Sequence, residues 1–161
     1  MKIIGILFLF ISILFFGFYL SEKYISILND IKRADRLLKN IILGLESENL
    51  TVKEIFEFSK KSGDEKTLCF LNSISPKDFC KITKKSVETG FCKDKAVNSY
   101  LEEAFFVLGK YTAYEQIREI NICRNKINDY YKKEEKTIYE KAKLSGYSGI
   151  FAGILAVILF I

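Results

Sequence analysis

Two long apolar runs stand near the ends of the sequence, and neither contains a charged residue. The first covers residues 3–20 and the second covers residues 144–161. An α-helix rises ~1.5 Å per residue, so each run would reach ~27 Å, close to the ~30 Å hydrocarbon core of a bilayer. The pattern therefore predicts one transmembrane helix at residues 1–20 and a second at residues 144–161.

A cleaved signal peptide is the alternative for the first run, because it also begins with a basic residue followed by an apolar segment. Cleavage requires an A-x-A-like pair of small residues shortly after the run. The sequence at residues 17–22 reads GFYLSE and offers no such site. We therefore expect the first run to remain in the protein as a membrane helix.

Between the two runs, apolar residues recur three and four positions apart, which is typical of amphipathic helices. The first span is expected to continue as a helix to Leu43. Thr51 and Glu54 form a capping-box pattern that opens a second helix. The residues expected to face inward from that helix are Ile55, Phe56 and Phe58.

Further helices are expected along the rest of the middle region. They cover residues 68–74, the stretch from Pro76 to Gly90, and residues 91–108. The last helix begins at Tyr111 and runs straight into the C-terminal span, with Tyr114 continuing its apolar face. The predicted fold class is all-α: an antiparallel helical bundle at residues 21–143, flanked by an N-terminal and a C-terminal transmembrane helix.

Composition excludes several kinds of chemistry. The chain has 25 basic and 20 acidic side chains and contains no histidine. Serine–histidine and cysteine–histidine catalysis, histidine metal ligation and a histidine pH switch are therefore excluded. The acids Glu54, Glu57, Glu102 and Glu103 lie in ordinary amphipathic patterns, so no catalytic, cofactor or metal site is predicted. The mild positive charge suits a lipid surface better than a nucleic acid.

The four cysteines form no C-x-x-C pair, which makes a zinc or redox site a weak hypothesis. We expect reduced thiols that pack as small core residues. These are Cys69, Cys80, Cys92 and Cys123.

Basic residues flank both spans on the side of the middle region. They are Lys23, Lys32, Arg33, Arg36 and Lys39 after the first span, and Lys132, Lys133, Lys136, Lys141 and Lys143 before the second. The positive-inside rule then predicts a cytoplasmic middle region and two extracytoplasmic termini in the cell membrane.

Three small residues recur every four positions in the second span and share one helix face. They are Ser145, Gly149 and Gly153. Such a face allows close approach of another helix in lipid, and it is the candidate helix-packing site of the sequence. The alternative is that glycine is merely common in membrane helices.

Several short motifs resemble those of the stage III sporulation protein AB family. The first span closes on Gly17-Phe18, and Leu108-Gly109 is followed by Gln116. Gly149 and Gly153 precede the terminal aliphatic run ILAVILFI. The segment from Leu37 to Val52 is also similar, although Gly44-Leu45-Glu46-Ser47 stands where the family usually has a Tyr-Gly.

The resemblance implies a bundle like the cytoplasmic domains of the type II secretion platform protein F. It also implies a non-enzymatic platform in the complex that builds a channel between mother cell and forespore, in the mother-cell membrane around the forespore. The implied partners are the lipid bilayer, a cytoplasmic secretion-type ATPase and other channel components, with homo-oligomers as a further possibility. No catalytic residue and no cofactor is carried over from the family.

A second hypothesis is a small pore-forming membrane protein, similar to a holin, which would use the glycine face to assemble with copies of itself. It would need neither an ATPase nor a large folded domain.

Overall fold

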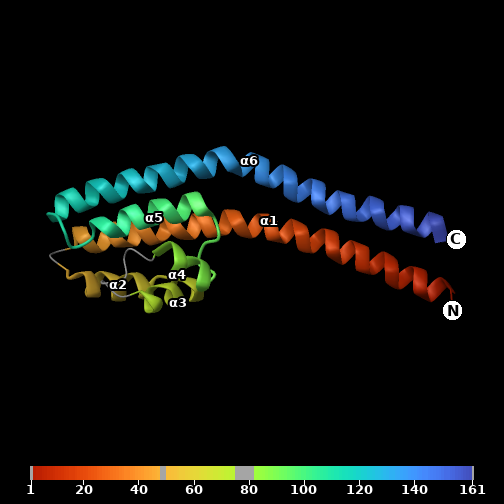
Figure 1. Cartoon of the computed structure of the whole chain (residues 1–161), viewed down its shortest axis with the longest axis horizontal. Coiled ribbons are helices and arrows are strands. Elements are labelled where there is room, and N and C mark those ends of the chain that lie inside the picture. The colour runs from red at the N-terminus through yellow and green to blue at the C-terminus, as the bar shows by residue number, and fades with distance from the viewer. Residues whose placement is uncertain (1, 48–49, 75–81, 161) are drawn as a thin grey trace. The chain divides into compact units, whose positions relative to one another are not determined.

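The structure, a computed structural model, describes residues 2–47, 50–74 and 82–160 (Figure 1). The described residues form helices without any strand, so the predicted all-α fold class is confirmed. The helices are α1 (Lys2–Glu46), α2 (Val52–Lys61), α3 (Glu65–Ser73), α4 (Ile82–Glu88), α5 (Lys95–Val107) and α6 (Ala113–Phe160).

The chain divides into two compact units. One contains Met1–Leu28 and Lys133–Ile161, and the other contains Asn29–Lys132. Helices α1 and α6 each contribute residues to both units, whereas α2 to α5 belong to the second unit alone. We call the first the hairpin unit and the second the helical unit.

The hairpin unit holds both predicted spans. Each of its long helices includes an 18-residue window that is long and apolar enough to cross a membrane. Only 6% of the window in α1 and 17% of the window in α6 is buried inside the protein. A core helix of a water-soluble protein would be mostly covered by protein. These two apolar surfaces therefore fit lipid contact.

The helical unit is built around α1, as Figure 1 shows, with α2, α3 and α4 on one side of this helix. Its interior aliphatic residues are at most 1% exposed: Ile31, Ala34, Leu37, Leu38 and Ile41 of α1. Phe70 of α3 stacks on Phe91 with ring centroids 4.3 Å apart. One face of α5 and the residue after this helix are also buried, at Val97, Leu101, Ala104, Phe105 and Leu108.

Two expected core residues are on the surface instead. Phe58 is 40% exposed and Tyr114 is 78% exposed. Tyr114 lies in the first turn of α6, and Phe58 lies outside the one stripe of the short helix α2 that reaches the core. In α2 that stripe is occupied by Ile55, Phe56 and Ser59.

Side-chain caps set the ends of the short helices. Thr51 caps α2, and its backbone N–H donates to Glu54 Oε2 at 2.7 Å, as the capping box predicts. The helix expected from residue 91 instead begins at Lys95. Gly90 takes a φ of 65°, and Asp94 Oδ1 accepts the backbone N–H groups of Ala96 and Val97. This cap is a sufficient physical reason for the later start. The predicted helix start at Pro76 lies outside the described residues.

Arg33 of α1 joins three segments of the helical unit. Its guanidinium donates to Asp30 at 2.7 Å, to Asp64 at 2.6 Å and to the Phe91 carbonyl at 2.9 Å. Asp64 also caps α3 by accepting from the Thr67 backbone N–H. Burial acts to raise the pKa of Asp64, but hydrogen bonds from Thr67 and Arg33 outweigh it and hold the pKa at about 2. The carboxylate therefore stays charged at neutral pH.

The expectation of core thiols is confirmed for two cysteines and wrong for one. Cys92 and Cys123 are buried, whereas Cys69 is exposed. Burial raises the pKa of Cys92 to about 12. Cys80 lies outside the described residues.

Candidate docking groove and helix contacts

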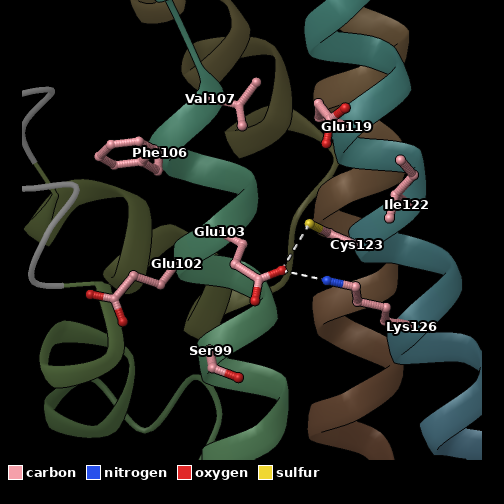
Figure 2. Close-up of a pocket in the computed structure, with 9 residues that line it drawn as sticks. All are labelled: Ser99, Glu102, Glu103, Phe106, Val107, Glu119, Ile122, Cys123 and Lys126. Carbon is pink, nitrogen blue, oxygen red and sulfur yellow. Dashed lines mark hydrogen bonds and ion pairs between the residues drawn. The ribbon is translucent and has the colours of Figure 1, made fainter.

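A groove runs along α5 and α6 within the helical unit and has a volume of about 640 Å³. Figure 2 shows its lining, with side chains contributed by both helices. The lining residues are Ser99, Glu102, Glu103, Phe106, Val107, Glu119, Ile122, Cys123 and Lys126. A surface that combines exposed apolar side chains with carboxylates is suited to binding a complementary segment.

Two large apolar side chains of the groove are solvent-exposed. Phe106 is 51% exposed and Ile122 is 40% exposed. Phe105, the preceding residue, is fully buried in the core. Because consecutive residues of a helix point about 100° apart, α5 presents one aromatic ring to the core and the next to the groove.

The polar part of the groove crosses from one helix to the other. Lys126 Nζ of α6 lies 2.7 Å from Glu103 Oε2 of α5, and the Cys123 thiol contacts the same oxygen at 3.8 Å, as drawn in Figure 2. The hydrogen bond to Glu103 raises the pKa of Lys126. Glu102 accepts from the Thr83 hydroxyl at 2.7 Å.

The thiol of Cys123 is not an activated nucleophile. Burial, together with the nearby Glu103 carboxylate, raises its pKa to about 11. A thiol acts as a nucleophile through its thiolate, and this thiol stays protonated at neutral pH.

In the sequence, Glu102 and Glu103 belong to ordinary amphipathic patterns, and no local pattern predicts this groove. The lining residues come from positions as far apart as Ser99 and Lys126. Only the adjacent pair Phe105-Phe106, which cannot lie on one helix face, signals an exposed aromatic residue at this place.

The residues similar to the family motif Leu-Gly…Gln meet in the loop between α5 and α6. Gly109 has a φ of 76°, a backbone conformation that favours glycine. Its N–H donates to Gln116 Oε1 at 3.1 Å, and Gln116 Nε2 donates to the Tyr111 carbonyl at 2.6 Å. Leu108 is buried beside this loop. One glutamine side chain therefore satisfies two loop backbone groups.

The small-residue face of the second span lies against the first span of the same chain. A Cβ added at Gly17 would be 2.8 Å from the Gly149 Cα and 3.3 Å from the Ser145 carbonyl oxygen. A Cβ at Gly153 would be 2.8 Å from the Phe10 ring. Gly17 lies against Gly149, whereas Phe10, which is earlier in the first helix, lies against Gly153, which is later in the second. The two helices are therefore antiparallel. This contact is too close for larger residues.

These features define the class: an all-α protein with two candidate membrane-spanning helices and a helical unit whose groove suits binding. The family model for stage III sporulation protein AB matches residues 2–161. The chain belongs to this family, which confirms the resemblance seen in the sequence and indicates a sporulation-related role. No curated protein and no solved structure matches the chain.

The glycine contact predicts a position-specific effect in the hairpin unit. Gly149→Leu should force the two spans apart and weaken their association by about 1–3 kcal/mol, because its side chain meets backbone. The measurement is energy transfer between fluorophores at the two chain ends during an SDS titration in mixed micelles. Gly146→Leu is the matched control, since a Cβ at Gly146 meets nothing within 4 Å. Equal behaviour of the two variants would refute the contact.

The loop contact predicts that Gln116→Ala speeds amide hydrogen exchange at Gly109. Losing this side chain leaves two loop backbone groups without their partner, at a cost of about 1–3 kcal/mol. Each ~1.4 kcal/mol changes an opening equilibrium tenfold, so exchange should rise by about tenfold or more. Arg118→Ala, at an exposed position in the same helix, is the control. Unchanged exchange at Gly109 in Gln116→Ala would contradict the role of Gln116.

Proposed function

We propose that the chain is a non-enzymatic membrane platform of the sporulation channel complex, contacting a cytoplasmic secretion-type ATPase. The observation that carries the proposal is the match to the stage III sporulation protein AB family over residues 2–161. The structure is compatible with it, because α1 and α6 each join an apolar segment to the helical unit without interruption. A platform needs such a connection between its anchor and its partner-binding part.

The proposed location is the mother-cell membrane around the forespore, with the helical unit in the cytoplasm and both termini outside it. The clusters of lysine and arginine on the inner flanks of both spans support this orientation. A cytoplasmic setting also suits free cysteines, one of which is exposed.

Absence of catalysis is part of the proposal. The sequence has no histidine, and the thiol in the groove is held protonated. The pore-forming alternative requires the glycine face for contacts between copies. Gly149 and Gly153 instead lie against Gly17 and Phe10 of their own chain, so we favour the platform.

The direct test is capture of the ATPase by the full-length chain. We expect the tagged protein, solubilised from membranes of sporulating cells, to retain the secretion-type ATPase in reciprocal pull-downs. A tagged membrane protein of unrelated family, solubilised in the same way, is the control. If neither protein captures the other although both are folded, the platform proposal is wrong.

Labelling of Cys69 tests the orientation. An impermeant maleimide should modify this exposed thiol only after cells are permeabilised, if the helical unit is cytoplasmic. Cys80→Ser removes the thiol outside the described residues, and burial makes Cys92 and Cys123 poor targets. Lys2→Cys in a Cys69→Ser, Cys80→Ser background should be labelled in intact vegetative cells that produce the chain, because their membrane faces the medium and no forespore encloses the extracytoplasmic side; Cys69 is compared in the same cells. Labelling of Cys69 in intact cells would reverse the orientation.

A further inference from the structure

We infer that the α5–α6 groove binds a short amphipathic helix of a partner protein, apolar on one face and bordered by lysine or arginine. This inference rests on the proposed function, since it names the kind of segment by which a partner engages the platform. The groove is shown in Figure 2.

Exposed apolar side chains are concentrated at this end of the helical unit. Phe106 and Ile122 line the groove, and Tyr111, which is 54% exposed, lines the adjoining hollow along α6. Val107 and Glu119 line both depressions, which makes them continuous. Contiguous exposed apolar surface bordered by polar residues is typical of an interaction site.

Charge selects the kind of helix. The groove is lined by the carboxylates of Glu102, Glu103 and Glu119 and by the ammonium of Lys126, and the adjoining hollow adds Glu115 and Arg118, so carboxylates outnumber cations by four to two. This acidic border stands out in a chain whose net charge is +5. Glu103 and Glu102 are already hydrogen-bonded, whereas Glu119 makes no such bond within the part of the chain that the structure describes. A basic side chain on the incoming helix would pair with Glu119.

The aromatic ring of the groove also accepts a cation. Lys110 Nζ lies 3.0 Å from the centre of the Phe106 ring. A lysine or arginine on a partner would have to displace Lys110 to take this place over the ring, and the face of the ring would attract its positive charge in the same way. An acidic peptide would gain neither this contact nor the pairing with Glu119.

The dimensions suit a helix of a few turns. Residues 99 to 107 of α5 span ~12 Å at ~1.5 Å per residue, and the adjoining hollow reaches further, to Tyr111. A partner helix would place apolar residues at positions i, i+3, i+4 and i+7 along this length. Its flanking positions would then face the carboxylates.

The experiment uses the full-length chain in phosphatidylcholine nanodiscs and two fluorescent 14-residue peptides. Both carry leucine at i, i+3, i+4 and i+7, and one has lysine and the other glutamate at the flanking positions. We expect saturable binding of the lysine peptide, measured by fluorescence anisotropy against empty discs. The glutamate peptide should bind at least about tenfold more weakly.

Variants locate the binding. Glu119→Lys should weaken the lysine peptide about tenfold, and Phe106→Ser with Ile122→Ser should abolish saturable binding. These side chains are exposed, so the fold should survive, which circular dichroism checks. Glu46→Lys, which makes the same charge change at the end of α1, and Val87→Ser, an exposed apolar position on α4, should have no effect.

Three results would each overturn the inference. They are equal binding of the two peptides, no saturable binding of the lysine peptide, and peptide binding that the groove variants leave unchanged. A dimer in the discs that Ile122→Ser separates would also overturn it, since the groove would then belong to a second copy. Capture of the ATPase that survives Glu119→Lys and Ile122→Ser would leave the platform standing and refute the groove as its docking site. Peptide binding without ATPase capture would leave the groove standing and refute the platform.

Discussion

The hairpin unit depends on a single constraint: the apolar side chains on the outside of its two helices are not covered by protein, so they need an apolar environment. Its two apolar windows are almost entirely unburied by protein. Exposing this apolar surface to water would cost free energy, whereas contact with hydrocarbon would not. Lipid in turn supplies no hydrogen bonds, so the backbone of each segment has to satisfy its own groups, and an uninterrupted helix does this. In hydrocarbon, hydrophobicity no longer holds two helices together. The backbone approach at Gly17 and Gly149 then contributes through close packing.

The helical unit is under a different constraint, because its helices α2 to α5 are short and their ends have to be held in place by specific contacts. Arg33 addresses it by binding two carboxylates and one carbonyl from separate places in the sequence. Asn98 and Ser86, both fully buried, make a second polar network, in which Ser86 Oγ donates to Asn98 Oδ1 at 2.7 Å and Asn98 Nδ2 donates to the Cys92 carbonyl at 3.0 Å. Buried polar groups are costly unless they are paired. These two networks therefore specify which segments meet, while the aliphatic and aromatic core supplies the driving force.

Most of the fold could be predicted from local patterns, and the exceptions have local causes. Uncharged runs and three/four periodicity were enough for the two long apolar helices and the all-α class, and Thr51 with Glu54 was enough for the start of α2. The start of α5 was misplaced because Asp94 caps the helix after a turn at Gly90. Thr112 with Glu115 forms the same capping pattern just before α6. The groove could not be found in this way, because Glu103 and Lys126 are brought together only by the packing of α5 against α6.

The exposed position of Phe106 follows from the same packing, and it has a consequence for recognition. An aromatic ring at the surface costs solubility, and here Lys110 and the surrounding carboxylates keep the region hydrated. The ring is therefore protected by a cation that the loop after α5 supplies. A partner has to offer the ring at least what Lys110 offers, either a cation or a tightly packed apolar side chain. Purely apolar segments meet the carboxylates without neutralising them, and acidic segments are repelled by them. In the inferred complex, the carboxylates of the groove would discriminate between partners, while its exposed apolar side chains would provide the area for binding.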